Sequence, residues 1–194
     1  MDYIDEIINL YAQDILNSSG MEMEKTFIQH GKTTLYEHSY SVCRKCVLIA
    51  LKFNLKVDFK SLVRGSLLHD YFLYDWHIKD KSHKLHGFVH AKIAYKNAKA
   101  DFELNKIESN MIKSHMFPLN FMIPKYKESI ILTIADKLCA ISETFSRVYD
   151  YELIIISKIM MENNKIKARS SIYSYASILV ILIIHTLMNF TPYL

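Results

Sequence analysis

Glycine, proline and cysteine are all scarce in this chain of 194 residues, which has four, three and three of them respectively. So few glycines and prolines leave long stretches without residues that interrupt helices, which argues against a turn-rich all-β protein. Three cysteines are too few for a scaffold held together by disulfides. Because 51% of the residues are hydrophobic, the chain can build a substantial core. The composition therefore predicts an all-α protein.

A strong charge of either sign is also lacking, since the formal net charge is +4. No dense block of Lys and Arg occurs, so we expect no nucleic-acid partner. Cys43 and Cys46 have CxxC spacing, but no second such pair completes a four-ligand zinc site, and we interpret both as reduced helix cysteines. The acidic, amphipathic amino terminus does not resemble a signal peptide. These features predict a cytoplasmic protein.

Helical periodicity and capping residues divide the first 150 residues, which we expect to form one domain, into successive helices. Thr34 with Glu37, and Asn105 with Glu108, have the spacing of capping boxes. Asp58 is the expected cap of a helix that continues through His69 and Asp70. The predicted helices cover residues 2–17, 34 to about 51, 58 to near 74, 86 onward, 105 to before 118, and 124–147.

Three polar residues interrupt otherwise apolar runs. His69 and Asp70 follow Leu67 and Leu68 in SLVRGSLLHDYF, and Asp136 lies in SIILTIADKLCAI. Burying such groups without partners costs about 2–7 kcal/mol each, and more for a charge. A shared metal ion would compensate for that cost, so these residues predict one polar centre.

The histidines and carboxylates occur along the chain in the order His38, His69-Asp70, His86, His115 and Asp136, each on a different predicted helix. With the segments YEHSYSV, VRGSLLHD and LTIADKL, this order resembles the HD-domain superfamily of metal-dependent phosphohydrolases. The resemblance covers about residues 25–147 and implies a helical HD-domain bundle. HGFVHA and MIKSHM are similar to the additional histidine segments of the two-metal branch of that superfamily.

The resemblance implies a set of metal ligands. One ion would be held by His38, His69, Asp70 and Asp136, and Asp70 would bridge to a second ion completed by His86 and His115. Within HGFVHA, His90 is the alternative to His86. Imidazole and carboxylate ligands suit Mn, Fe, Co or Zn, and Mg is an alternative that prefers oxygen ligands. The sequence does not decide whether the centre holds one ion or two.

The implied activity is hydrolysis of a phosphate ester or anhydride, of a nucleotide or a related small molecule. Two ions about 3.5–4 Å apart would polarise the phosphate and generate hydroxide for attack on phosphorus. Lys137 and Arg64 are candidates for stabilising the developing phosphate charge, beside the bridging Asp70. Two alternatives stay open: an inactive HD domain that binds a nucleotide or protein as a sensor or scaffold, and a mononuclear centre in which His86 and His115 contact substrate.

The last part of the chain, residues 151–194, is predicted to be a helical extension. No charged residue occurs from Ser170 to Leu194, and Lys165, Lys167 and Arg169 precede this apolar segment. A span needs about 20 apolar residues, so residues 170–194 could anchor the protein to the inner face of a membrane. Ser171, Ser174, Ser177, His185 and Asn189 equally suit a helix packed on the protein or on another copy. The sequence does not predict an oligomeric state.

Overall fold

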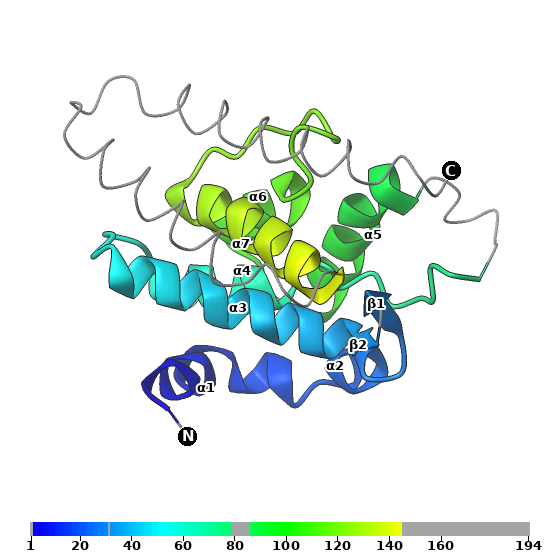
Figure 1. Cartoon of the computed structure of the whole chain (residues 1–194), viewed down its shortest axis with the longest axis horizontal. Coiled ribbons are helices and arrows are strands. Elements are labelled where there is room, and N and C mark those ends of the chain that lie inside the picture. Colours follow the sequence, from blue (N-terminus) through cyan, green and yellow to red (C-terminus); the bar gives the residue numbers. More distant parts are fainter. Residues whose placement is uncertain (1, 31, 79–85, 145–194) are drawn as a thin grey trace. The chain divides into compact units, whose positions relative to one another are not determined.

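The computed structural model describes residues 2–30, 32–78 and 86–144 (Figure 1). Within these ranges the regular secondary structure is helical except for one short antiparallel hairpin, which confirms the all-α prediction. The residues up to Glu143 form one compact unit. The elements are α1 (Tyr3–Leu16), α2 (Ser19–Glu24), β1 (Ile28–His30), β2 (Thr33–Thr34), α3 (Leu35–Lys52), α4 (Phe59–Leu67), α5 (His86–Asp101), α6 (Lys106–Ser114) and α7 (Lys127–Thr144).

Capping side chains begin several helices at the residues that the sequence indicated. The hydroxyl of Thr34 accepts a hydrogen bond from the Glu37 amide at 3.2 Å, while the Glu37 carboxylate accepts one from the Thr34 amide at 2.8 Å. Asn105 and Glu108 form the same reciprocal pair at the start of α6. A cap of this kind contributes about 1 kcal/mol, and these two fix the starts of α3 and α6.

The helix expected to run from Asp58 to near residue 74 is shorter than predicted. It ends at Leu67, and His69 and Asp70 lie in the turn that follows. Nδ1 of His69 donates a hydrogen bond to the carbonyl oxygen of Ser66 at 2.7 Å, and the backbone of Leu73 adopts a positive φ of 57°. The apolar run continues past the helix because the turn is itself buried, so hydrophobicity does not mark where α4 ends.

The last described helix also differs from its prediction, because α7 begins at Lys127 and Pro124 lies in the preceding loop. The buried side chain of Asn110 on α6 accepts a hydrogen bond from the Lys125 amide at 2.8 Å and donates one to the Ile123 carbonyl at 3.3 Å. These two hydrogen bonds hold the backbone around Pro124 in a non-helical conformation. The α6–α7 loop, residues 115–126, is therefore tied to α6.

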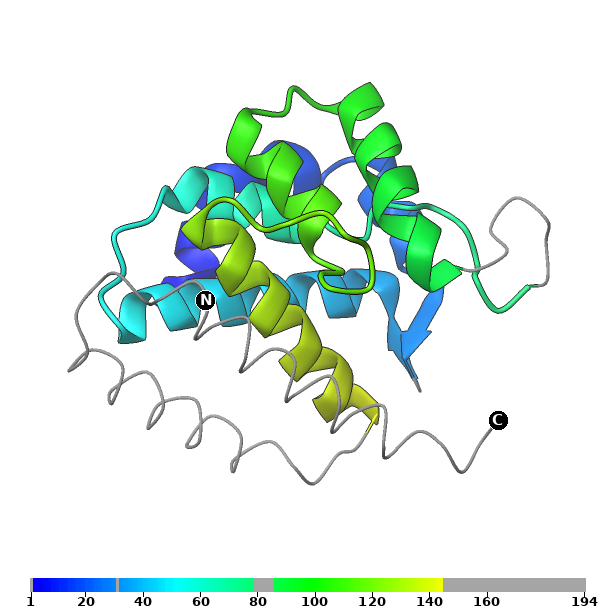
Figure 2. The same ribbon diagram turned by 90° about the horizontal axis from the view of Figure 1, so that it is seen from above.

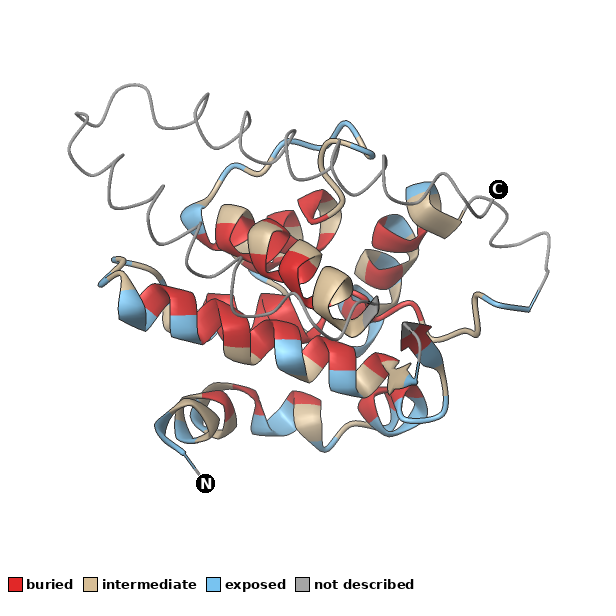
Figure 3. Ribbon diagram, viewed as in Figure 1, coloured by how far each residue is buried: buried red, intermediate tan, exposed pale blue. Residues whose placement is uncertain are grey.

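Two clusters of buried apolar residues share α3 and α4. One cluster joins them to α1, α2, α5 and Ile112 of α6, and the other joins them to α6 and α7. In Figure 3 the buried positions form a band along α3, and Figure 2 shows α5 and α6 side by side, as their contacts require. Cys43 belongs to the first cluster and Cys46 and Cys139 to the second, and all three are free and buried, as expected for reduced helix cysteines.

A glycine permits one close approach that matters for the centre of the molecule. A Cβ atom on Gly20 of α2 would lie 1.5 Å from the hydroxyl oxygen of Tyr71, a fully buried residue next to Asp70. Only a residue without a side chain fits against this rigid ring. Gly20 lies inside α2, and this contact fixes α2 against Tyr71.

None of the helices in the described ranges is long and apolar enough to cross a bilayer. The expected helical extension over residues 151–194, including the segment from 170, lies outside the described residues. Both interpretations of that segment remain predictions.

Candidate metal centre

Five separate parts of the fold contribute side chains to one buried polar centre. His38 comes from the first turns of α3, His69 and Asp70 from the turn after α4, and His90 from α5. His115 caps the end of α6, and Asp136 lies in the middle of α7. Each of the six has a relative exposure of 6% or less, so the centre is enclosed by the helices that build it.

These residues form two groups of donor atoms, each with all its atoms within 4.8 Å of one another. In the first group, Oδ1 of Asp136 lies 3.3 Å from Nε2 of His38 and 3.7 Å from Nε2 of His69. In the second, Oδ1 of Asp70 lies 3.3 Å from Nε2 of both His90 and His115. Each group therefore offers two imidazoles and one carboxylate.

Asp70 lies between the two groups and turns one oxygen toward each. Its Oδ1 faces the second group, while its Oδ2 lies 3.6 Å from Nε2 of His69 and 3.9 Å from Nε2 of His38. A carboxylate in this position can bind two cations at once, one through each oxygen. This is the arrangement that a bridging Asp70 requires.

The histidine rings are oriented so that Nε2 of each one faces the centre. Nδ1 of His69, His90 and His115 lies 2.7–2.9 Å from a backbone carbonyl oxygen, which can only accept a hydrogen bond. Nδ1 of His38 lies 2.9 Å from a carboxylate oxygen of Glu143. A protonated Nδ1 leaves the lone pair of a neutral ring on Nε2, which is the form that binds a metal.

The donor set fits a divalent metal ion. Ligands about 2.1 Å from one ion, at tetrahedral or right-angled positions, lie about 3.0–3.4 Å apart, close to the spacings found here. Nε2 of His90 and Nε2 of His115 are 2.9 Å apart, and both carry lone pairs if their Nδ1 atoms are protonated. Nε2 of His69 and Oδ1 of Asp70 are buried without a hydrogen-bond partner. A cation would satisfy all of these atoms, and the ligand types do not choose among Mn, Fe, Co, Zn and Mg.

A family model described as the HD domain matches residues 35–141, which is more than half of the chain. The chain belongs to the HD-domain family. The matched range contains all six residues of the centre and the helices from α3 to α7 that carry them. Neither the curated proteins nor the solved structures include one that matches this chain.

The electrostatics of this HD domain keep both carboxylates ionised and His90 neutral. Burial alone would raise the pKa of Asp70, but His69, His115 and His90 hold that pKa well below its usual range. Burial likewise opposes ionisation of Asp136, whose pKa is kept low chiefly by Lys137 and His38. Burial lowers the pKa of His90 to about 3, so His90 is neutral at physiological pH. Deprotonated donors are what metal binding needs.

One of the predicted ligands is replaced by its alternative. The structure places His90 in the second group, whereas Nδ1 of His86 lies 2.8 Å from the Tyr74 hydroxyl. The two histidines are four residues apart on α5, so they share a helix face and their rings stack with centroids 4.6 Å apart. His90 lies one turn further into α5, where that face meets His115. Helical periodicity could not decide between them because it gives both the same face.

The two predicted phosphate-binding cations have different positions. Nζ of Lys137 lies 2.8 Å from Oδ2 of Asp136 and 3.4 Å from the carbonyl oxygen of His115, so its ammonium is at the edge of the centre. Arg64 was expected to serve the same centre, but its guanidinium lies between Asp14, at 2.6 Å, and Glu108, at 3.5 Å. The structure therefore shows Arg64 in contact with α1 and α6 and does not bring it together with the six donor residues.

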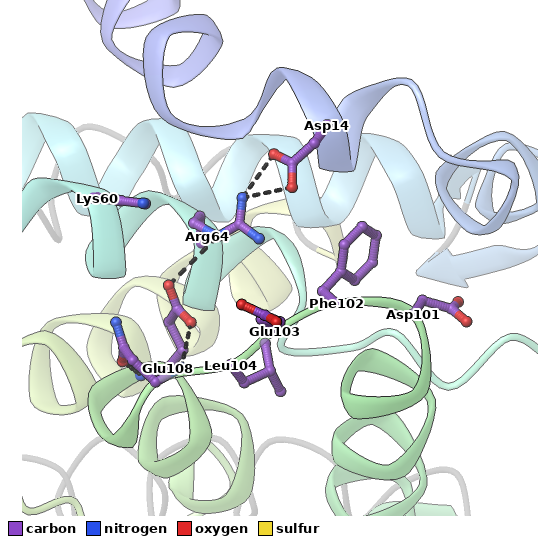
Figure 4. A pocket seen from close by; sticks show the side chains of 9 residues that line it. Asp14, Lys60, Arg64, Asp101, Phe102, Glu103, Leu104 and Glu108 are labelled. Carbon is purple, nitrogen blue, oxygen red and sulfur yellow. Dashed lines mark hydrogen bonds and ion pairs between the residues drawn. The ribbon is translucent and has the colours of Figure 1, made fainter.

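Arg64 instead lines a separate pocket of about 600 Å³ (Figure 4). The figure shows the guanidinium between the carboxylates of Asp14 and Glu108, with Phe102 and Glu103 nearby. None of the six donor residues lines this pocket. Arg64 is therefore part of an ion-pair network that joins α1, α4 and α6.

Three supporting residues were missed by the sequence interpretation. Glu143 orients His38 from α7, where it follows Asp136 by two helical turns, and that spacing is the signal that could have revealed it. Gln29 of β1 donates a hydrogen bond from Nε2 to Oδ2 of Asp70 at 2.7 Å. Glu24 of α2 is fully buried, and neither of its carboxylate oxygens has a hydrogen-bond partner of ordinary length. Nothing in the sequence near Gln29 or Glu24 marks them.

Proposed function

We propose that this HD-domain protein is a metal-dependent phosphohydrolase that cleaves a phosphate ester or anhydride of a nucleotide or a related small molecule. The observation that carries the proposal is the position of Asp70, whose two oxygens face two separate groups of metal-binding atoms. A single structural ion would need only one group. A shared carboxylate between two groups is the architecture used for displacement at phosphorus.

Bound divalent cations would supply Lewis-acid polarisation of the phosphate and would acidify an attacking water. The protein's own contribution is to fix the donors before substrate arrives. The carbonyl of Ser66 holds His69, the carboxylate of Glu143 holds His38, and Gln29 holds Asp70. Rings and carboxylates held in this way need little reorganisation during the reaction, which lowers the barrier.

Lys137 is the cation placed to meet the substrate. Its ammonium contacts Asp136 at the edge of the centre, and its side chain is 17% exposed, so one side of it is open to solvent. A phosphate bound at the two groups would bring its developing negative charge close to this ammonium. We assign Lys137 the role of stabilising that charge, and we remove Arg64 from this role.

A row of stacked aromatic and imidazole rings next to the second group supports a nucleotide substrate. The Trp76 ring stacks on His86 with centroids 5.1 Å apart and an interplanar angle of 13°, and His86 in turn stacks on His90. Four aromatic residues follow Asp70 in the sequence, at positions 71, 72, 74 and 76. Tyr71 and Phe72 are buried in the core and cannot contact a base. Trp76 and Tyr74 are partly exposed, so they are the rings of this segment that a base could reach.

The decisive experiment purifies the full chain without chelators, counts bound metals, and screens nucleotide phosphates for hydrolysis with the native protein and Asp70→Ala. We expect hydrolysis to fall below detection in the variant and at least about one metal equivalent to be lost. Glu6→Gln, an exposed carboxylate on α1, is the control and should keep both. Unchanged turnover in Asp70→Ala would rule out the mechanism.

The same measurements separate the alternatives. Tight nucleotide binding by the metal-loaded protein without turnover of any phosphate would identify an inactive binding domain instead of a hydrolase. A native protein that holds only one ion while turning over substrate would identify a mononuclear centre, with His115 and its neighbours contacting the substrate.

A further inference from the structure

The α6–α7 loop exposes a run of large apolar side chains. Phe121 is 96% exposed and Ile123 is 58% exposed, and Leu119 and Met122 between and before them are also exposed. Single apolar residues on a surface are ordinary, but four within five positions form a contiguous patch, and such patches mark interaction sites. This apolar tip, residues 119–123, is not used by the proposed hydrolytic centre.

The loop is held in the conformation that exposes these side chains. Asn110 of α6 bonds to the backbone of Ile123 and Lys125, and the Ser129 hydroxyl donates to Asn110 in turn at 2.8 Å. Nδ2 of Asn120 donates to the carbonyl oxygen of Lys113 at 2.7 Å. The chain on both sides of Phe121 is thus fixed by hydrogen bonds, and these bonds hold the loop in the conformation that exposes the ring.

The charge around the tip has one sign. Between Glu108 and Glu128 the chain has no acidic residue, but it has three lysines at positions 113, 125 and 127. Lys125 and Lys127 are exposed immediately after the tip. Apolar side chains flanked by lysines are the pattern of a surface that inserts into the boundary between lipid headgroups and acyl chains, with the lysines contacting anionic headgroups.

We propose that the apolar tip of the α6–α7 loop docks this protein on an anionic lipid surface. Phe121, Met122 and Ile123 enter the headgroup boundary while Lys125 and Lys127 contact lipid phosphates. The complementary charge argues for a lipid surface over a second copy of the chain, because two copies would bring like-charged lysines together. The docking is independent of the hydrolytic proposal, and it does not depend on residues 170–194.

The loop also connects the lipid surface to the candidate metal centre. His115, a member of the second donor group, is the first residue of the loop, and Nζ of Lys137 contacts its carbonyl oxygen. A docked tip would therefore hold the metal centre close to the bilayer. Membrane recruitment and the centre would share one segment of chain.

The test places an environment-sensitive fluorophore on the loop of the full chain. Phe121→Cys is labelled with a thiol-reactive dye, which is selective because the three native cysteines are buried. Leu10→Cys on α1, which replaces a side chain of 73% exposure away from the loop, is the matched control. Both labelled proteins are reconstituted at the same protein-to-lipid ratio with vesicles of phosphatidylglycerol or of phosphatidylcholine. Thermal unfolding of the unlabelled variants confirms that both fold.

We expect a blue shift of emission at position 121 with phosphatidylglycerol, little shift with phosphatidylcholine, and no shift at position 10. Salt should weaken the response, and Lys125→Gln with Lys127→Gln should raise several-fold the fraction of anionic lipid needed for half the shift. Absence of a shift at position 121, or an equal shift with both lipids, overturns the proposal. A blue-shifted emission at position 121 without lipid also overturns the proposal. If that shift grows with protein concentration, the tip self-associates. If the shift does not depend on concentration, another part of the chain covers the tip.

Discussion

Oε2 of Glu143 lies 2.9 Å from Nδ1 of His38, so a carboxylate orients this ring, whereas backbone carbonyls orient His69, His90 and His115. A carboxylate partner makes the imidazole a stronger metal ligand than a carbonyl does. In the metal-free protein, burial lowers the pKa of His38, but contacts with Asp136 and Glu143 raise it to about 10. Glu143 therefore both positions His38 and supports its charge.

Replacing Glu143 should weaken metal binding at the first group without removing a ligand. We expect Glu143→Gln, which keeps an oxygen acceptor but loses the charge, to lower metal affinity about 10-fold, and Glu143→Ala to lower it up to about 100-fold. Competitive titration against a metallochromic chelator measures both. Glu103→Gln, an exposed glutamate in the stretch between α5 and α6, should leave the affinity as it is. Equal affinities for all four proteins would show that Glu143 has no part in the centre.

The choice between His86 and His90 can be decided by metal counting. His90→Ala should reduce the bound metal by about one equivalent, because it removes one of three donors from the second group. His86→Ala should keep the native stoichiometry, since the Nδ1 partner of His86 is the Tyr74 hydroxyl. The two variants delete the same side chain one turn apart on α5, so each serves as the control for the other. The opposite pattern would restore His86 as the ligand.

The contact between Gly20 and Tyr71 predicts a large effect of a small substitution. In Gly20→Ala the new Cβ would overlap the Tyr71 ring, and a buried rigid ring can move only with its surroundings, so we expect a loss of about 1–3 kcal/mol in the free energy of unfolding. Gly87→Ala on α5 is the matched control, because a Cβ there meets nothing within 4 Å. It should be neutral or stabilising by up to about 1 kcal/mol. Denaturant unfolding of both variants makes the comparison, and similar stabilities would contradict the observed packing.

The buried carboxyl of Glu24 predicts a pH-dependent stability in the metal-free protein. Burial, followed by the charge of Asp70, raises the pKa of Glu24 well above 4.5 in the folded state. Above pH 4.5 the unfolded chain releases this proton and the folded chain keeps it, so Glu24 makes the folded state progressively less stable as pH rises, until it ionises there too. The slope is at most about 1.4 kcal/mol per pH unit.

Glu24→Gln should remove this loss, so its stability advantage over the native protein should grow between pH 5 and pH 8 in the presence of a chelator. Unfolding curves at several pH values measure the difference. For the exposed control Glu103→Gln the difference should stay flat with pH. An advantage of Glu24→Gln that shrinks as pH rises would mean that Glu24 is ionised in the fold.

Local sequence patterns predicted much of the fold because the information for them is local. The capping pairs Thr34–Glu37 and Asn105–Glu108 lie three residues apart, and the structure has α3 and α6 starting directly after Thr34 and Asn105. The same reasoning failed where the determinant was distant. Asn110 delays the start of α7 to Lys127, and the turn after α4 continues the apolar run of the helix, so neither boundary is visible in nearby residues.

The sequence by itself determined the helical class, the family and the types of donor, because buried histidines and aspartates among apolar neighbours have few other physical explanations. Only the tertiary structure decided that His90 and not His86 enters the second group, that Arg64 belongs to an ion-pair network elsewhere, and that Glu143, Gln29 and Glu24 surround the centre. These are contacts between side chains on different elements. They depend on how deep each residue lies along its helix and on which neighbour it meets, and periodicity specifies only the face.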